Sequence, residues 1–331
     1  MRAALALLVS ALTAAAAPAP PPGAGTPAVS PSSSSPSPAG SVRFAPKAPS
    51  GSSATLDVRF EIETRDVTYD VPPAYRDSFG FWTNRMKGSR RSELFQYVSV
   101  TDDPGTDGAV HFRKQLARYQ VDVLQGGQSL TPFDQAVKDM EGLVWEGHLD
   151  RFGNVKESHL VAGKQDPEMA DSGMSWVDAF FPRVEGERDL KTGDRITAVE
   201  SVPLPSQLNI QGLEKVRVLV TRELTFKTVS GGQARFDVKT AYATDPTTKP
   251  TAAGTNCVIG GDGAGDVAFD LKRGVFVASR QASTLTLDIE APLRPLPEHP
   301  ETEKAGPGKS RLVLGITYNG QQAVHKILGE D

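Results

Sequence analysis

Apolar and polar residues alternate with a period of two over most of this chain, and this alternation limits the possible fold more than any other feature. Successive side chains of a strand point to opposite faces of a sheet, so the pattern predicts strands with one buried and one solvated face. We therefore predict a mainly β domain: a curved antiparallel sheet, in the form of a half-barrel or a sandwich, with two short helices. The clearest runs are LDVRFEIETR from Leu56, VRVLVTRELTFKTV from Val216, ARFDVKTAYAT from Ala234 and STLTLDIEA from Ser283.

Three short sequences are expected to form turns between strands. They are Ser230-Gly231-Gly232, Lys272-Arg273-Gly274 and Asn319-Gly320. The Asn-Gly pair suits a type I′ hairpin, because both central residues of that turn need a positive φ.

A glycine-rich segment, NCVIGGDGAGDVAFDLKRGVFVASR from Asn256 to Arg280, suggests at first a phosphate or calcium site. A dinucleotide fingerprint needs its glycines between a strand and a helix, whereas a strand, a turn and a strand follow here. The calcium repeat G-G-x-G-x-D fits only until its sixth place, which is Gly265, and the motif needs tandem copies. We interpret the segment as the edge and turn of a β-hairpin, where glycine permits a bulge or a close backbone approach.

Two helices are expected to interrupt the strands. The first is TPFDQAVKDMEG, with Thr131 as N-cap, Pro132 at the first helical position and Gly142 at the end. The second lies around DSGMSWVDAFFP and stops at Pro182. Their apolar faces would be Phe133, Val137 and Met140 in the first, and Trp176, Val177, Phe180 and Phe181 in the second. The aromatic face is expected to pack on a sheet; the alternative is a lid over an apolar cavity.

The N-terminal part of the chain predicts export. Residues 1–16 have Arg2, an apolar run and small residues around Ala14-Ala15-Ala16, which together are typical of a secretory signal peptide. Residues 17–41 are almost purely Pro, Ser, Gly and Ala and predict a disordered tether. Residues 42–331 would form the β-rich domain. We expect a secreted or periplasmic protein without a transmembrane segment, because the apolar run is too short to span a bilayer.

Charge and cysteine content exclude several classes of function. The formal net charge of −4 argues against nucleic acid as a partner. The basic stretch NRMKGSRRSE, with Arg85, Lys87, Arg90 and Arg91, is interpreted as a solvated turn. Cys257 is the single cysteine, and we expect it to be buried as a small apolar residue rather than to act as a nucleophile.

No sequence motif supports catalysis or a cofactor. The chain contains no G-x-S-x-G elbow and no H-E-x-x-H motif. Gly308-Lys309-Ser310 resembles the end of a phosphate-binding loop, but the first glycine of that motif would fall at Glu303, and a strand follows. A protein without enzymatic activity is therefore favoured.

One hairpin, HLDRFGNVKESHL, carries a candidate metal site. A turn at Phe152-Gly153 would place His148 opposite Glu157, and a turn at Gly153-Asn154 would place it opposite His159. In both registers one face carries His148, Asp150, Glu157 and His159, and the other carries Trp145, Leu149, Leu160 and Ala162. Two imidazoles and two carboxylates on adjacent strands could bind zinc. The simpler interpretation is a solvated face, for which we expect the first register, since the second opposes two carboxylates.

A weak internal similarity, which we call the internal echo, relates this hairpin to the glycine-rich segment. WEGHLDRFGNVKESHL from Trp145 and VAFDLKRGVFVASRQ from Val267 both run strand, Asp, short basic turn with Gly, Val, strand. The echo indicates either two similar β layers or hairpins that share turn rules, and we favour the second.

The order of these features from about Trp145 to Glu290 resembles a family of uncharacterised secreted bacterial proteins grouped as a domain of unknown function. The resemblance includes the stretches FFPRVEGERDLKTGDRI and FDLKRGVFVASRQASTLTLDIE. More distantly it is similar to the half-barrels of periplasmic lipoprotein carriers of the LolA kind. That resemblance implies a curved antiparallel sheet with helices covering an apolar concavity, and it offers no catalytic residues.

Three functional hypotheses follow from these observations. The leading one is a non-enzymatic envelope protein that binds a lipid, another apolar ligand or an envelope protein partner through Trp176, Phe180 and Phe181. The second is a metal-binding protein or metal-dependent hydrolase that uses the His148 hairpin. The third is a structural secreted β module.

Overall fold

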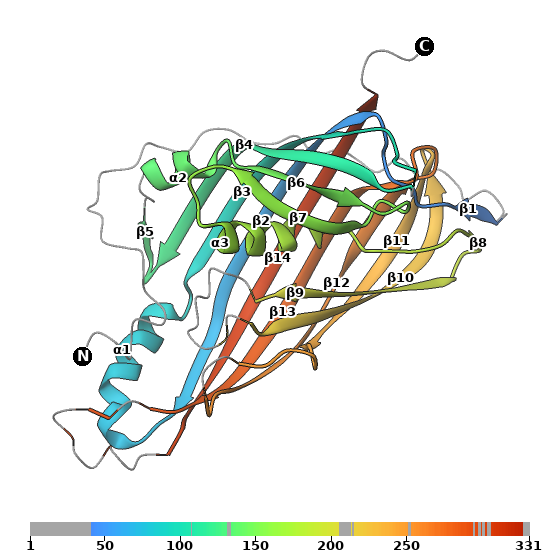
Figure 1. Cartoon of the computed structure of the whole chain (residues 1–331). Coiled ribbons are helices and arrows are strands. Elements are labelled where there is room, and N and C mark those ends of the chain that lie inside the picture. Colours follow the sequence, from blue (N-terminus) through green and yellow to red (C-terminus); the bar gives the residue numbers. More distant parts are fainter. Residues whose placement is uncertain are drawn as a thin grey trace, which may run out of the picture.

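The protein is mainly β, as the alternation of its residues predicts. The computed structural model describes residues 41–106, 108–130, 134–204, 213, 215–250, 253–293, 295–296, 299, 302 and 306–326. One antiparallel sheet of twelve strands contains most of them, and a separate two-stranded sheet pairs β1 (Val42–Phe44) with β8 (Arg188–Leu190). Figure 1 shows the long strands of the large sheet running side by side through the molecule.

The path through the large sheet is β7-β6-β4-β3-β2-β14-β13-β12-β11-β10-β9, and the short β5 pairs with β4 beside it. The strands on the first half of this path are β7 (Val155–Ala162), β6 (Val144–Leu149), β4 (Val110–Gln125), β3 (Arg90–Thr101) and β2 (Ser52–Asp70), with β5 (Gln128–Leu130). The others are β14 (Gly308–Lys326), β13 (Val275–Ala291), β12 (Asn256–Asp270), β11 (Gln233–Thr244), β10 (Arg217–Ser230) and β9 (Arg195–Pro203).

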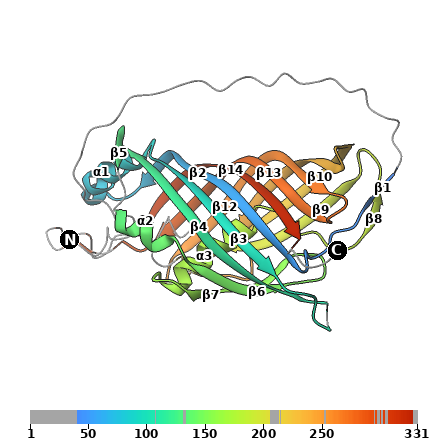
Figure 2. The same cartoon turned by 90° about the horizontal axis from the view of Figure 1, so that it is seen from above.

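The sheet curves around a concave side, which the view in Figure 2 shows from above. Its edge strands β7 and β9 are not joined by a strand pairing in the described residues. Helix α3 (Pro167–Asp178) lies between them, because it packs against both β7 and β9. Two hydrogen bonds attach it there: Leu160 N donates to Asp171 Oδ1, and Trp176 Nε1 donates to the carbonyl of Pro203. The arrangement is a half-barrel whose open side is covered by one helix.

The main hydrophobic core fills this concave side. Along the long strands buried residues mostly alternate with exposed ones, as in β10 and β11, and the phase changes at the bulges of β4 and β13. The phenyl ring of Phe180 stacks on Tyr318 of β14 with ring centroids 4.7 Å apart, and it also lies near Phe60 of β2. A second cluster of phenylalanines lies at the far end and contains Phe44, Phe226, Phe236, Phe269 and Phe276.

The glycine-rich segment (Asn256–Arg280) forms the predicted β-hairpin, from β12 through the turn at residues 271–274 into β13, but the prediction that it lies at a sheet edge is wrong. Its glycines lie in the middle of β12, which is paired with β11 on one side and β13 on the other. A Cβ at Gly261 would lie 2.0 Å from the carbonyl oxygen of Thr284, and one at Gly265 would lie 2.0 Å from that of Arg280. The close backbone approach that glycine permits therefore occurs here within a continuous strand that is paired on both sides.

Two of the three predicted turns are confirmed. Strands β10 and β11 join through Gly231 and Gly232, and β12 and β13 join through residues 271–274. The hairpin predicted at Asn319-Gly320 is wrong, since both residues lie within β14. There Asn319 pairs with Arg280 on β13 and with Arg59 on β2, so neighbours on both sides hold the residue in the sheet.

Three α-helices are present in the described residues, one more than the sequence predicts. Helix α2 (Asp134–Met140) is the first predicted helix, and it ends as expected before Gly142, which has a φ of +86°. Its proposed cap, Thr131, Pro132 and Phe133, lies outside the described residues. Helix α3 begins at Pro167 and stops at Asp178, so Phe180 and Phe181 follow the helix instead of belonging to it.

The unpredicted helix is α1 (Arg76–Met86), which follows a short 3₁₀ turn, η1 (Pro73–Tyr75). No side chain caps its N-terminus, so the local helix signal is weak. A tertiary contact supports it instead, because the ring of Phe79 packs on Tyr69 of β2 at 5.6 Å between centroids. The basic residues that follow form ion pairs on the strands, including Lys87 with Asp66 at 3.0 Å and Arg90 with Glu61 at 2.5 Å.

The internal echo has a local explanation in turn chemistry. Asp150 Oδ1 accepts hydrogen bonds from the backbone of Phe152 and Asn154, and Asp270 Oδ1 accepts them from Lys272 and Arg273. The same Asx geometry in both turns agrees with the preferred interpretation, in which the two hairpins share turn rules.

Residues 45–49 connect these two turns, and we call this segment the strap. Lys47 N donates to the carbonyl of Gly274, at 2.9 Å, and Ala48 N donates to that of Arg151, at 3.1 Å. Gly274 has a φ of +72°, and a Cβ there would lie 2.7 Å from the carbonyl oxygen of Ala45. The strap thus crosses the end of the half-barrel, from the β12–β13 turn to the β6–β7 turn.

Candidate functional site

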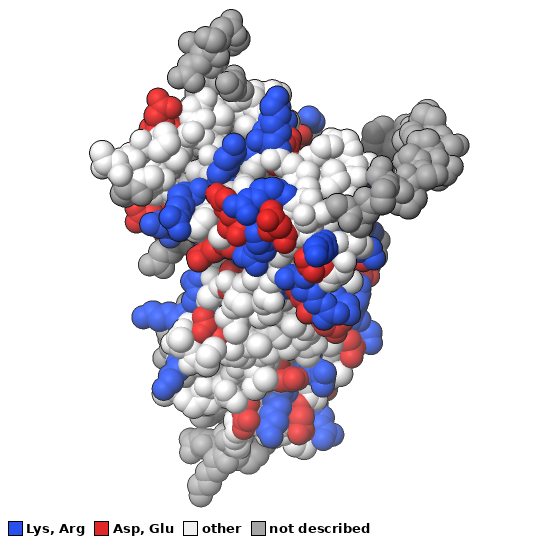
Figure 3. Space-filling model, turned by 90° about the vertical axis from the view of Figure 1, so that its right-hand side faces the viewer, with Lys and Arg blue, Asp and Glu red and all other residues white. Residues whose placement is uncertain are grey.

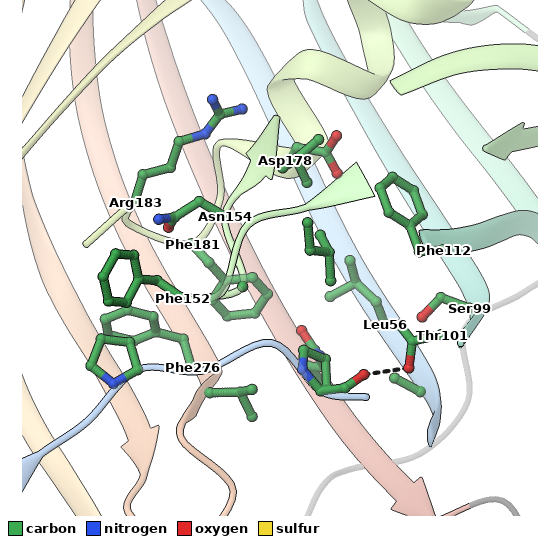
Figure 4. Close-up of a pocket in the computed structure, with 18 of the residues that line it drawn as sticks. Leu56, Ser99, Thr101, Phe112, Phe152, Asn154, Asp178, Phe181, Arg183 and Phe276 are labelled. Atoms are coloured by element: carbon green, nitrogen blue, oxygen red, sulfur yellow. Dashed lines mark hydrogen bonds between the residues drawn. The ribbon is translucent and has the colours of Figure 1, made fainter. Parts of the chain in front are cut away.

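A pocket of about 140 Å³ lies beneath the strap, at the end of the concave side. We call it the end pocket. Its walls come from β2, β3 and β4, from the β6–β7 turn, from the segment that follows α3 and from the β12–β13 turn. Figure 4 shows aromatic side chains from several of these elements around one space, among them Phe112, Phe152, Phe181 and Phe276.

Charged groups also line the end pocket. Lys114 Nζ of β4 lies 2.5 Å from Asp178 Oδ1 at the end of α3, and both side chains are nearly buried. The same ammonium lies 5.4 Å from the centroid of the Phe112 ring. Lys47 and Arg183 contribute two further cations to the lining, and Asp178 is the one acidic residue among the described residues that line it. The lining therefore combines aromatic surface with an excess of positive charge.

Hydroxyl groups attach the strap to the floor of the pocket. Ser52 Oγ of β2 and Thr101 Oγ1 of β3 share a hydrogen bond of 3.0 Å. Both hydroxyls also lie within hydrogen-bond distance of the Pro49 carbonyl, 3.1 Å from Ser52 Oγ, so one of them donates to that carbonyl while the other donates across the pair. These contacts position the strap over the pocket from the β2–β3 side (Figure 4).

The three aromatic residues proposed from the sequence lie in different places. Phe181 is partly exposed and lines the end pocket. Trp176 and Phe180 are buried in the main core, so they pack on the sheet as the simpler expectation held. The sequence hypothesis placed all three at one ligand surface because it assumed that one helix carries them, whereas that helix stops before Phe180.

The β6–β7 hairpin has the register that places His148 opposite Glu157. Their side chains are joined, with His148 Nδ1 2.9 Å from Glu157 Oε1. Asp150 lies in the turn, where its carboxylate accepts backbone hydrogen bonds, and His159 pairs in register with Glu146. The structure therefore brings two of the four proposed metal ligands together and places the other two apart from them.

A neighbour that the sequence analysis missed completes this face. His111 of β4 pairs directly with His148 of β6, and their ring centroids are 5.5 Å apart. His111 Nδ1 lies 2.9 Å from Asp102 Oδ2. Only the pairing of β4 with β6, which joins residues far apart in sequence, could have revealed this neighbour.

A buried ion pair lies under α3 on the concave side. The Arg222 guanidinium of β10 contacts the Glu200 carboxylate of β9, and Arg222 also donates to the carbonyl of Ala179 at 2.7 Å. Burial raises the pKa of Glu200, although the positive charges of Arg222 and Arg183 oppose this change. The pair connects the end of α3 to the edge of the sheet.

The sequence did contain a signal for this pair. Glu200 occupies the same inward phase of β9 as Ile196, Ala198 and Val202, and Arg222 occupies the inward phase of β10 between Val220 and Leu224. A charged residue at an inward-facing position, between apolar residues of the same strand, indicates a buried ion pair or hydrogen bond, because an unpaired buried charge is strongly unfavourable.

Cys257 is buried in the main core, as expected from the sequence. Burial raises the pKa of its thiol to about 11. Its position on β12 thus gives it the environment of a small apolar residue.

Within the described part of the chain, no three or more His, Cys, Asp and Glu side chains form a group suited to a metal ion. The described helices include none that is both long and apolar enough to cross a membrane. Acidic and basic side chains are interspersed on the face shown in Figure 3.

Comparison with known proteins identifies no family for this chain. No protein-family model matches it, and no curated protein matches it. Among solved structures, the chain is similar to the secretin InvG (residues 176 to the end) of the Salmonella SPI-1 type III secretion injectisome in the open gate state. The identity is 8% and the TM-score 0.14; the match covers 85% of this chain and 60% of the secretin chain. A TM-score this low does not establish a shared fold. The resemblance to LolA-like carriers stays a prediction, because no match to such a carrier supports it.

Proposed function

We propose that this chain is a non-enzymatic, exported envelope protein that binds a small apolar ligand in the end pocket. The observation that carries the proposal is the aromatic lining beneath the strap, to which Phe181 belongs. Ligand sites are typically concave and mostly apolar, with a few polar groups that orient the ligand. Export is proposed from the signal-like residues 1–16 and the Pro- and Ser-rich residues 17–41.

The volume of the pocket limits the size of the ligand. A cavity of about 150 Å³ lined by apolar side chains accommodates benzene. The end pocket, at about 140 Å³, is therefore suited to one aromatic ring or a short aliphatic segment. An entire acylated lipoprotein anchor would exceed this volume, so only the end of a longer chain would lie inside.

The charges of the lining favour a ligand with an anionic end. Asp178 neutralises one of the three cations, Lys47, Lys114 and Arg183, and Glu200 lies 3.5 Å from Arg183 behind the pocket. Lys47 is at the strap, where the pocket meets its rim. A fatty acid or an aromatic carboxylate has this combination of an apolar body and a negative terminus.

A substitution that fills the pocket tests the proposal. Ser99 of β3 lines the end pocket, whereas its neighbour Val98 is 41% exposed on the other face of the strand. Ser99→Phe places an aromatic ring in a space of about that size, and Val98→Phe adds the same ring to solvent. We expect protein purified without detergent to release an apolar carboxylate on solvent extraction, detected by mass spectrometry. Ser99→Phe should abolish this and Val98→Phe should preserve it.

Two results would contradict the proposal. One is a wild-type protein that releases no ligand and does not bind an added fluorescent fatty acid, which would favour the structural β module. The other is equal ligand binding by Ser99→Phe and wild type while both unfold at the same temperature, which would place the ligand elsewhere. A protein partner that inserts one aromatic side chain would give no extractable ligand, but Ser99→Phe would still block its binding.

A further inference from the structure

Two histidines and two carboxylates form one row across the outer face of four neighbouring chain segments. The order is Asp102 after β3, His111 on β4, His148 on β6 and Glu157 on β7. His111 and His148 are directly paired in the β4–β6 ladder, and His148 and Glu157 are paired in the β6–β7 ladder. The backbone of Asp102 continues the row, because its N–H donates to the carbonyl of His111 at 2.9 Å.

Each imidazole uses the same nitrogen to contact its carboxylate. His111 Nδ1 lies 2.9 Å from Asp102 Oδ2, and His148 Nδ1 lies 2.9 Å from Glu157 Oε1. An ionised carboxylate only accepts hydrogen bonds, so a neutral ring in this geometry carries its proton on Nδ1. The lone pair is then on Nε2 in both rings, which is the form that binds a metal ion.

The two carboxylates lie on opposite sides of the histidine pair. Glu157 is on the β7 side and Asp102 on the β3 side, so each Nδ1 is directed away from the other ring. In both rings Nε2 is the nitrogen that does not contact the carboxylate. The ring centroids are 5.5 Å apart, and the planes are inclined by 64° rather than stacked face to face.

We propose that His111 and His148 bind a divalent transition metal ion through their Nε2 atoms, with Asp102 and Glu157 orienting the rings. A carboxylate on the second nitrogen of a metal-binding histidine fixes the tautomer and raises the basicity of the ligand. Zinc binds imidazole nitrogen at about 2.0–2.1 Å, so two such ligands lie at most about 4.2 Å apart. Water fills the other positions, since both histidines are partly exposed, at 39% and 46% of the side chain.

The surrounding charges favour a cation at this place. The nearest row on the same face contains Arg113, which pairs with Glu146 at 3.2 Å and is therefore neutralised. The carboxylates of Asp102 and Glu157 contribute two negative charges to the row itself. Imidazole and water ligands suit zinc and copper better than calcium or magnesium, which prefer oxygen ligands.

This site differs from the hairpin site expected from the sequence. It uses His148 from that set, adds His111 from another strand and assigns Glu157 an orienting role. His159 has no part in it, because it is paired with Glu146 in the neighbouring row. The site is also separate from the end pocket, so either proposal can fail without the other.

Isothermal titration of the mature full-length protein with zinc chloride at neutral pH, without an affinity tag, tests the site. Wild-type protein should take up one equivalent. His111→Ala and His148→Ala should each lose this uptake, whereas His159→Ala, which removes another exposed histidine from the same face, should retain it. Asp102→Asn and Glu157→Gln should weaken binding by about 10- to 100-fold, as loss of such orienting partners does.

Thermal unfolding without metal checks that each variant is folded, and His111→Gln and His148→Gln replace any alanine variant that is not. The proposal is overturned if wild-type protein shows no saturable uptake. It is also overturned if folded variants of His111 or His148 bind zinc like wild type, or if His159→Ala loses binding as completely as His148→Ala does.

Discussion

Substitution of Gly261 by alanine should destabilise the protein strongly, for two separate reasons. The residue has a φ of +139°, a conformation that side chains other than glycine rarely adopt. Its Cβ would lie 2.0 Å from the carbonyl oxygen of Thr284, on the main chain of β13, and no flexible side chain can move aside to relieve that contact. Both costs arise at the point where the backbones of β12 and β13 approach each other closely.

The expected magnitude is the sum of these two costs. Backbone strain of this kind costs about 1–3 kcal/mol. Overpacking in a dense interior costs about 1–3 kcal/mol as well. Gly261→Ala should therefore lower the free energy of unfolding by about 2–6 kcal/mol. With a urea dependence of about 3 kcal/mol/M, a loss of 3 kcal/mol moves the unfolding midpoint down by about 1 M.

The adjacent residue provides the control. A Cβ added at Gly260 meets no heavy atom within 4 Å, and its φ is not in the left-handed region. Gly260→Ala should be neutral or stabilise by up to about 1 kcal/mol, because glycine within a strand loses more chain entropy than alanine. Urea unfolding followed by tryptophan fluorescence compares the two variants. The reasoning about the close approach and the positive φ is refuted if their free energies of unfolding agree within about 0.5 kcal/mol.

Two further predictions concern charged groups of the concave side and its rim. Arg222→Met should destabilise the protein by about 3–5 kcal/mol, because it leaves the buried Glu200 carboxylate without its cation. In a double-mutant cycle, adding Glu200→Leu should recover much of this loss, and independent, additive losses would disprove the pairing. Hydrogen bonds, first among them that from Ser201, lower the pKa of Asp245 below its usual value, so the stabilisation is present above about pH 4 and is lost as the pH falls further. Asp245→Asn should therefore flatten the acid side of a plot of urea midpoint against pH, and an unchanged slope would contradict this.

The period-two alternation predicted the strands well because it depends on burial, which is local to each strand face. It also assigned the outward phase correctly to His148 and Glu157. The alternation gives no information, however, about which strands lie next to one another in the sheet. Strand β2 pairs with β14 across most of the length of the chain, and β4 pairs with β6 past α2, so the contact between His111 and His148 could not be read from either strand alone.

The local sequence around a glycine did not predict whether that glycine lies in a turn or within a strand. Gly231 and Gly232 form a predicted turn, whereas Gly320 lies within a strand that has neighbours on both sides. The difference is tertiary, because a strand with two partners gains backbone hydrogen bonds that outweigh the turn preference of Asn-Gly. Helix α1 is the converse case, since packing on β2 supports a helix with a weak local signal.

The strap also determines how the protein would respond to mechanical load. Any pull applied through the residues before Ser41 reaches β1 first, where only three residue pairs join it to β8. The next points of resistance are the buried ring of Phe44 and then the two backbone hydrogen bonds of Lys47 and Ala48. Tension would break these attachments one after another and would uncover the end of the half-barrel before it reached the long pairing of β2 with β14.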